Sequence, residues 1–430
     1  MFGEPVAPEE VEALLARRPD LWAEPYPIYH RLRATQPVYP TGTSVLLTRY
    51  ADVAAALRDR RMSSNRNHGS TRLAVLESLA EPERTQFREM MEFTGLWMLL
   101  NDPPDHTRLR GLANQAFTAR RVGQMRERIQ GIVDDLLDAV APRGAMDAIA
   151  DLAAPLPVFV IAELVGIPRE GRARMKRWSD VVGTFLGGLS NAGEMHQTIA
   201  EFRVYLLELA AQRRCEPRDD LLTGLVQAEE ERSRLSEEEL LAMCVLLLVA
   251  GHETTTHLIG NGLLTLLRHP DQLAHLRDDP ALIQPAVEEL LRYESPLPAI
   301  PRVPLEDVEI DGTVVPAGVS LDLLLGAANR DPDIFPDPDR LDITRQDNKH
   351  LAFAHGPHFC LGAPLARLEA QVTLGTLVRR FSQLQLAAQP VQWFPLFGLR
   401  GLTALPVTWK SPTSVSLPTA GNEASRGSAE

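Results

Sequence analysis

One uninterrupted helical stretch constrains the fold of this chain more than any other feature. It opens at Ser236, where Glu239 three residues on completes a capping box. The stretch then continues without a proline to His269, just before Pro270. At 1.5 Å per residue it is roughly 50 Å long, longer than a small domain is wide. Its middle, Met243–Ala250, is apolar on every side, so we expect this helix to cross the interior of the protein.

Most of the remaining chain also carries helical patterns. Apolar residues recur at helical spacing over Ala119–Val140 and again from Ile199 to Leu209, and a further helical pattern covers Ala363–Arg380. Strand signals are scarce. Val45–Thr48 is typical of a short strand, and residues 308–315 predict a hairpin whose Asp-Gly pair suits a type I′ turn. The sequence therefore predicts a mainly α fold with a small β region.

Composition indicates a soluble globular protein. The 430 residues are 44% hydrophobic and 23% charged, as in ordinary soluble proteins. A formal net charge of −13 argues against nucleic acid as a partner, since such proteins normally carry a basic surplus. We interpret residues 1–410 as a single domain and the polar, aperiodic residues 411–430 as a disordered tail.

The sequence also favours a reducing compartment. Cys215, Cys244 and Cys360 are odd in number and far apart, which is no disulfide framework. The first residues lack the basic start and apolar core of a signal peptide. The longest apolar run, Leu240–Ala250, is well short of the roughly 20 residues that span a bilayer. We expect a cytoplasmic monomer without a membrane anchor.

The segment Phe353–Gly362 concentrates reactive chemistry. Glycines four residues before and two residues after Cys360 suggest a tight turn that presents the thiol. The helical pattern that follows places the thiol before a helix N-terminus, where amide groups stabilise a thiolate ligand or nucleophile. A buried structural cysteine is the plain alternative, which the glycines and His358 disfavour. A zinc site with His355 is a second alternative, but it offers only three close ligands.

A second polar group interrupts the apolar centre of the long helix. Glu253 and Thr254 lie within Ala250–Thr255, and polar side chains in such a setting are costly unless they are used. His252-Glu253 followed by His257 invites comparison with a zinc-peptidase motif. That motif needs histidines at i and i+4, whereas here they are at i and i+5, roughly 140° apart around the helix. We therefore reject the peptidase interpretation.

Together these segments resemble the cytochrome P450 superfamily. Residues 353–362 follow the pattern Phe-x-x-Gly-x-His-x-Cys-x-Gly, which is similar to the haem-binding signature of that family, with one departure at Ala354, where glycine is common. The resemblance covers residues 22–410 and implies the P450 fold with one haem b. It implies that Cys360 is the proximal thiolate ligand of the iron, in a loop completed by Gly362. His358 would bond a haem propionate, and Phe353 would pack beside the sulfur.

The resemblance also assigns the distal side of the haem to the long helix. Ala250 and Gly251 would lie against the haem, with Gly251 leaving room for dioxygen. Glu253 and Thr254 would be the acid–alcohol pair that delivers protons to it.

Two further motifs complete the resemblance. His106 and Arg110 would clamp one haem propionate, and Arg302 would bond a propionate as well. Glu289 and Arg292 would form a structural ion pair with an arginine in the later irregular segment, which we expect to be Arg340.

The implied activity is insertion of one oxygen atom from O₂ into a medium-sized hydrophobic molecule, by hydroxylation or epoxidation, in secondary metabolism. Electrons would come from NAD(P)H through a separate ferredoxin and ferredoxin reductase, because the sequence has no flavin or iron–sulfur domain of its own. The arginine-rich segment from His106 to Arg128 would be the docking face for an acidic ferredoxin. The expected pocket residues are Val249, Ala250, Leu297, Ala299, Ile300 and Phe397.

Two other functions stay open at this point. The protein could be a P450 that performs oxidative coupling or another oxidation without hydroxylation. It could also be a haem-thiolate binder without turnover, although the Glu253–Thr254 pair favours an enzyme, since a binder has no use for proton delivery.

Overall fold

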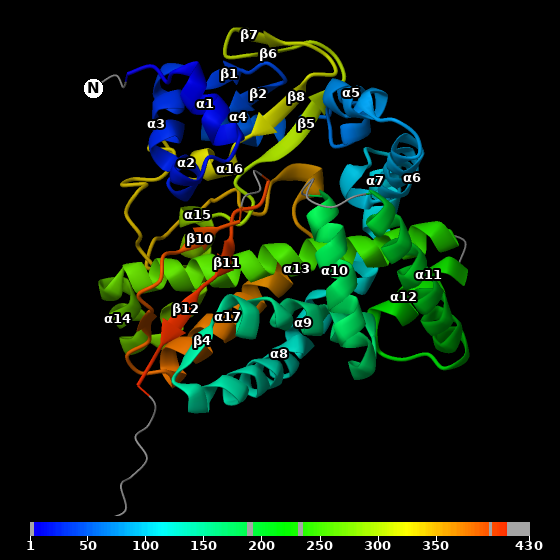
Figure 1. Ribbon diagram of the computed structural model, residues 1–430, viewed down its shortest axis with the longest axis vertical. Coiled ribbons are helices and arrows are strands. Elements are labelled where there is room, and N and C mark those ends of the chain that lie inside the picture. The colour runs from blue at the N-terminus through cyan, green and yellow to red at the C-terminus, as the bar shows by residue number, and fades with distance from the viewer. Residues whose placement is uncertain (1–3, 187–191, 231–234, 395–397, 411–430) are drawn as a thin grey trace, which may run out of the picture.

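The computed structural model describes residues 4–186, 192–230, 235–394 and 398–410. Helices dominate these residues, as the sequence predicts. The main sheet and the first four helices form a smaller upper part, and the other long helices form a larger part around one central helix, α13 (Figure 1). Phe397 and the tail 411–430 lie outside the described residues.

The helices follow one another along most of the chain. They are α1 (Pro8–Leu15), α2 (Pro19–Ala23), α3 (Tyr26–Thr35), α4 (Tyr50–Ala56), α5 (Ser70–Ser78), α6 (Glu83–Gly95), α7 (Asp105–Ala116), α8 (Ala119–Val140), α9 (Pro155–Val165), α10 (Arg172–Leu186), α11 (Ala192–Cys215), α12 (Leu221–Glu230), α13 (Glu237–Arg268), α14 (Pro270–Asp278), α15 (Ile283–Tyr293), α16 (Leu325–Ala328) and α17 (Ala363–Arg380).

In the part of the chain that the structure describes, the strands are short and form four small sheets. They are β1 (Val38–Pro40), β2 (Ser44–Leu47), β3 (Met62–Ser63), β4 (Ala145–Asp147), β5 (Ile300–Pro304), β6 (Val308–Ile310), β7 (Thr313–Val315), β8 (Ser320–Leu323), β9 (Gln385–Leu386), β10 (Gln392–Trp393), β11 (Leu402–Ala404) and β12 (Pro406–Thr408).

The main sheet has the order β1-β2-β8-β5-β3. Its one parallel pairing joins β2 to β8 with Ser44 opposite Ser320, so the sheet ties the N-terminal part to the segment after α15. The predicted hairpin is β6–β7, and its turn has the positive φ values expected for Asp-Gly, 49° at Asp311 and 74° at Gly312.

Helix α13 confirms the central expectation from the sequence. Ser236 caps it, and both hydrogen bonds of the capping box with Glu239 are present. Among the described helices it alone has the length and hydropathy of a membrane span, and 72% of that apolar window is buried inside the protein. Its apolar surface is therefore used for packing in the core.

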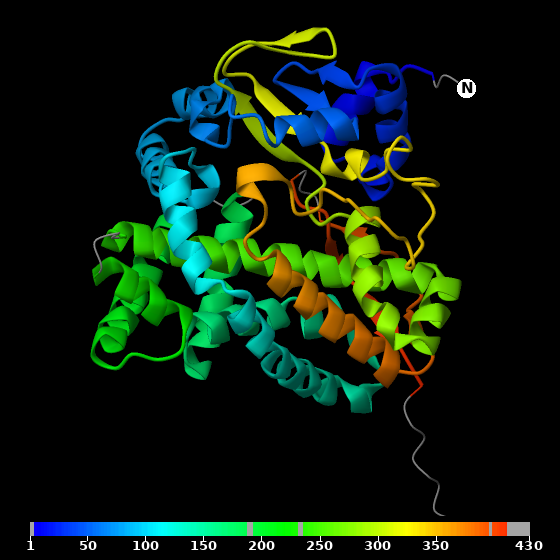
Figure 2. The same ribbon diagram turned by 180° about the vertical axis from the view of Figure 1, so that it is seen from behind.

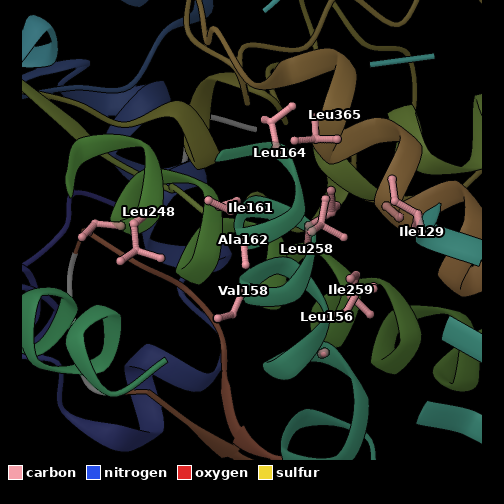
Figure 3. Packing of buried hydrophobic residues seen from close by; sticks show 14 of the residues in the cluster. Ile129, Leu156, Val158, Ile161, Ala162, Leu164, Leu248, Leu258, Ile259 and Leu365 are labelled. Atoms are coloured by element: carbon pink, nitrogen blue, oxygen red, sulfur yellow. The ribbon is translucent and has the colours of Figure 1, made fainter. Parts of the chain in front are cut away.

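The largest core cluster lies around α13. Figure 3 shows apolar side chains of α9, among them Ile161 and Ala162, packed close to Leu258 of α13. Helix α17 contacts α13 as well and crosses it in Figure 2. Because α17 starts three residues after Cys360, this packing fixes where the cysteine lies relative to the central helix.

A buried ion-pair network holds the segment that leads to Cys360. Glu289 and Arg292 on α15 have fully buried side chains and form two hydrogen bonds of 2.8 Å. Arg292 also donates to the carbonyls of Asn329 and Pro338, at 3.0 and 2.7 Å. The irregular segment is thus bonded to α15 through a guanidinium whose charge the neighbouring carboxylate balances.

The second arginine on Glu289 is Arg345, and our expectation of Arg340 was wrong. The Nε of Arg345 lies 3.2 Å from the Glu289 carboxylate, whereas Arg340 contributes only its backbone carbonyl, which accepts from Arg292 at 3.3 Å. The side chain of Arg340 is exposed. The turn after residue 340 brings the later arginine back toward α15, and the sequence spacing alone does not show this.

The network predicts different effects for the two arginines. Replacing Arg345 with Leu removes one cation from a buried carboxylate, so the free energy of unfolding should fall by about 1–3 kcal/mol. Arg340→Leu, at an exposed side chain, should change it by less than about 0.5 kcal/mol. Urea unfolding of the two variants measures this difference, and equal stability of both would contradict the pairing.

Candidate active site

The backbone of residues 353–362, the Cys360 loop, is a set of tight turns. Gly356 has φ +73°, and a Cβ there would lie 2.7 Å from the carbonyl oxygen of Leu57. Only glycine fits both constraints. Ala354 also lies in the left-handed region, with φ +57°, so the residue that departs from the family pattern sits where glycine would be less strained. The amide of Cys360 donates to the carbonyl of Phe353 at 3.0 Å, which closes the loop.

The environment of the Cys360 sulfur has opposing effects on its pKa. Burial raises the pKa of the thiol, while backbone hydrogen bonds from Gly362 and Ala363 and the charges of Arg110 and Arg367 lower it. The two amides belong to the start of α17, as the sequence predicts. The sulfur thus faces donors and cations that favour the thiolate once a metal ion is bound to it.

Phe353 and α17 shield one side of this loop. Phe353 is buried, and the guanidinium of Arg367 lies 4.5 Å from its ring centroid. Arg367 also forms an ion pair of 2.7 Å with Glu288 on α15. The sequence analysis did not identify Arg367 or Glu288, because an arginine on a helix gives no sign of which ring it will cover.

Four basic side chains converge beside the loop although they come from three distant segments. His106 and His358 have ring centroids 4.0 Å apart. Burial first, and then the charges of His106, Arg302 and Arg110, lower the pKa of His358 to about 3. Burial and the charge of Arg66 lower the pKa of Arg302 to about 10. These groups repel one another, and such a cluster suits an anionic ligand.

This cluster fits the propionates of a haem. The Nε2 atom of His106 is buried and has no hydrogen-bond partner among the described residues. This nitrogen is therefore available for a hydrogen bond to a ligand. Arg110 is close enough to Cys360 for the two charges to interact. A cysteine sulfur and a set of cationic donors thus lie side by side, as a metal-bearing macrocycle with carboxylate arms requires.

The side of α13 that carries Thr254 is accessible although most of the helix is buried. Ala250 is exposed, and Leu247 and Thr254, which are three residues before and four after it, are half-buried. This spacing places the three on one helix face. The Thr254 hydroxyl donates to the Ala250 carbonyl at 2.7 Å, which orients its oxygen within that face.

The neighbouring Glu253 faces a different group of side chains. Burial and the charge of Asp180 on α10 raise the pKa of Glu253. One Glu253 oxygen also lies 3.6 Å from Nε2 of His257. Glu253 and Thr254 are therefore adjacent in the chain but contact different partners.

The expected role of Gly251 was wrong in one respect. A Cβ at Gly251 would collide with the Cδ1 atom of Ile161 on α9. The side-chain direction at this position thus faces a packed helix rather than a space for dioxygen. Gly251 permits the close approach of α9 and α13, a requirement that a single sequence motif does not reveal.

The expected pocket residues divide into two groups. Ala250 is exposed and Leu297 and Ile300 are half-buried, so ligand could reach them, whereas Val249 and Ala299 are buried in core clusters. Phe397 lies outside the described residues.

The arginine-rich segment 106–128 is less basic than its sequence suggests. Arg108 pairs with Glu239, Arg121 with Asp219 at 3.6 Å and Arg128 with Glu163 at 3.9 Å. Acidic residues distant in sequence therefore neutralise part of it. Arg120 and Arg126 are exposed.

The structure does not assemble the alternative zinc site at Cys360. His355 is exposed. Among the described residues, the group of side chains with metal-ligand geometry is instead Asp180, His252 and Glu253.

Comparison with known proteins defines the family. The Cytochrome P450 family model matches residues 184–392. The chain is 48% identical to Cytochrome P450 107B1 of Saccharopolyspora erythraea, over 84% of this chain and 88% of that protein. It is 45% identical to the Cytochrome P450 monooxygenase PikC of Streptomyces venezuelae, over 91% and 92% of the two chains.

A solved structure agrees with these sequence relatives. The crystal structure of P450BioI in complex with an acyl carrier protein bearing hexadec-9Z-enoic acid superposes with a TM-score of 0.82 at 40% identity, covering 91% of this chain and 99% of that one. The chain belongs to the cytochrome P450 family. It is a haem-dependent monooxygenase of the bacterial type.

The turns of the Cys360 loop predict opposite effects for two substitutions. Ala354→Gly relieves a left-handed alanine and should raise the free energy of unfolding by about 0.5–1 kcal/mol, after the entropy that glycine adds to the unfolded chain. Gly356→Ala should lower it by about 2 kcal/mol or more, because strain and the contact with Leu57 add together. Urea unfolding of the haem-loaded proteins checks both, and a less stable Ala354→Gly would contradict the strain argument.

Proposed function

We propose that Cys360 is the axial ligand of one haem b and that the enzyme hydroxylates or epoxidises a medium-sized hydrophobic substrate. The observation that carries this assignment is the convergence of the Cys360 loop with basic side chains from α7 and β5, which with His358 make four. His106, Arg110, Arg302 and His358 would hold the propionates. Bound haem supplies reductive activation of dioxygen, which no protein side chain can provide.

The protein side chains around the sulfur would keep its charge in place. The amides of Gly362 and Ala363 donate toward the sulfur, which limits how basic the thiolate becomes. Buried Phe353, with the guanidinium of Arg367 over its ring, would limit the access of water to one side of the loop. Where water is kept away the local dielectric is low, which strengthens the hydrogen bonds and the charge interactions of the sulfur.

Glu253 and Thr254 would move protons on the opposite side. Because burial raises the pKa of Glu253, its carboxyl group can hold and release a proton closer to neutral pH than an exposed glutamate can. The Thr254 hydroxyl lies on the accessible face of α13, where it can donate a hydrogen bond to a reacting oxygen once it leaves the Ala250 carbonyl.

The accessible apolar residues support a hydrophobic substrate. Ala250 offers carbon surface next to Thr254, and Leu297 and Ile300 offer it just before and at the start of strand β5. Such surface favours apolar molecules. The relatives include the monooxygenase PikC and P450BioI, whose crystal structure holds an acyl carrier protein bearing a fatty acid. We propose that the substrate of this enzyme comes from secondary metabolism.

Reduction would come from NAD(P)H through a ferredoxin reductase and a ferredoxin. Exposed Arg120 and Arg126 support a docking face for an acidic partner, weaker than the full segment would give. We further propose that residues 1–410 act as one cytoplasmic, monomeric domain. The single domain is supported by a core cluster that combines N-terminal with C-terminal residues, such as Trp22 with Trp393.

Ligation by Cys360 predicts a spectroscopic change. The reduced wild-type protein with CO should absorb at the long-wavelength Soret position of thiolate-ligated haem, and Cys360→His should move it to the shorter position of imidazole ligation. His355→Gln, in the same loop but exposed, should leave the band unchanged. Wild-type protein that purifies with zinc and without haem would overturn the assignment.

Proton delivery predicts a loss of coupling. Thr254→Ala should still bind substrate and oxidise NAD(P)H, but product formed per NAD(P)H should fall by roughly tenfold, with peroxide released instead. Glu253→Gln should reduce coupling too, whereas Thr254→Ser keeps the hydroxyl and should retain most of it. If Thr254→Ala and Glu253→Gln both kept wild-type coupling, the pair would have no role in proton transfer.

A further inference from the structure

A polar cluster lies between α10 and α13, and it shares Glu253 with the proposed proton-delivery pair. Asp180, His252 and Glu253 each direct a potential ligand atom to one place, and these atoms all lie within 4.8 Å of one another. Asp180 comes from α10, which crosses α13 and contacts it (Figure 1). Two of the ligands are neighbours in sequence, so the third is supplied only by the tertiary fold.

The His252 ring is held as metal-binding histidines usually are. It is almost fully buried, and its Nδ1 lies 2.7 Å from the hydroxyl of Ser179 on α10. A backbone hydrogen bond to Ala154 also reaches this ring. These partners fix the orientation of the imidazole, and a metal ion bound at a ring nitrogen would have to replace any partner on that nitrogen.

His257 is an independent sign that the cluster accepts a ligand. Its side chain is 4% exposed, and neither of its ring nitrogens has a hydrogen-bond partner among the described residues. Its Nε2 points toward Glu253, 3.6 Å from the carboxylate. A buried imidazole without a partner costs free energy, and a cation shared with Glu253 would satisfy one nitrogen.

The charges of the cluster favour a cation that can enter from solvent. Asp180 is 45% exposed and pairs with Lys176 at 2.8 Å, while Glu253 is 22% exposed. The two carboxylates lie close enough that the charge of Asp180 acts on Glu253. A dication would attract both carboxylates and compete with Lys176 for Asp180.

We propose that Asp180, His252 and Glu253, with His257 as a fourth donor, bind a divalent transition-metal ion of the zinc type. Two imidazoles and two carboxylates make a mixed nitrogen and oxygen donor set, which suits zinc, whereas calcium and magnesium prefer oxygen ligands alone. The Zn–N and Zn–O distances of about 2.0–2.2 Å require the side chains to draw closer together on binding, and His257 most of all, because it lies outside the group of ligand atoms within 4.8 Å of one another.

The site would make the enzyme sensitive to zinc. A metal ion on Glu253 excludes the proton that we propose this carboxyl carries, so zinc would lower coupling of NAD(P)H to product. This consequence, but not the binding itself, depends on the proposed function of Glu253.

Equilibrium dialysis of the haem-loaded ferric protein against Zn²⁺, with zinc and iron counted by elemental analysis, tests the site without turnover. We expect about one zinc per iron in the wild type, and binding weakened by roughly tenfold or more in Asp180→Asn and in His252→Gln. His196→Gln is the matched control, because His196 is an exposed histidine that also neighbours a carboxylate, Glu89. It should bind zinc as the wild type does.

Two results would overturn the proposal: a wild type that binds no stoichiometric zinc, or an Asp180→Asn/His252→Gln variant that retains it. Because Asp180 is half-exposed, Asp180→Asn gives an answer even if His252→Gln fails to fold. A coupling assay with zinc then separates the two proposals. Zinc that binds without changing coupling confirms the site and contradicts proton delivery by Glu253. Absence of zinc binding together with uncoupled Glu253→Gln contradicts the site alone.

Discussion

The carboxylate of Glu289 is the point on which the loop around Cys360 depends. It is fully buried and receives hydrogen bonds from Arg292, Arg345 and Asn348, so α15 and the later irregular segment meet on one negative charge. Taking these charges out of water is expensive, and removing one partner leaves another buried and unbalanced. The irregular chain from 329 to 348 is thus fixed by ion pairs rather than by backbone ladders. The Cys360 loop follows this segment in the chain, so its position depends on the same ion pairs.

The region beside Cys360 is built for negative charge, in contrast to the acidic protein around it. The net charge of the chain is −13, yet His106, Arg110, Arg302 and His358 are gathered where burial makes each of them harder to protonate. Mutual repulsion of this kind lowers stability unless an anion compensates it. Of these four groups, Arg110 also lowers the pKa of the Cys360 thiol, so one guanidinium serves both anion binding and metal ligation by sulfur.

Helix α13 serves a different purpose on each of its faces. Apolar residues pack against α9, the face with Ala250 and Thr254 is accessible, and Glu253 turns toward Asp180 and His257. Because an α-helix has about 3.6 residues per turn, two residues that are neighbours in sequence point to different faces and can have different functions. Coupling between the accessible face and the polar cluster needs no long pathway, because Glu253 and Thr254 are neighbours.

The sequence by itself determined the elements and the chemistry of the motifs. Caps, prolines and apolar spacing act locally, so the bounds of α8 and α17 and the start of α13 follow from the residues themselves. The tertiary structure decided which distant side chains meet. It placed Arg345 rather than Arg340 on Glu289, set Ile161 against Gly251, and neutralised Arg108 with Glu239. It also brought Asp180 to His252, where the spacing within α13 alone gave no metal site. Contacts of this kind depend on how helices cross, and the crossing depends on the packing of the whole core.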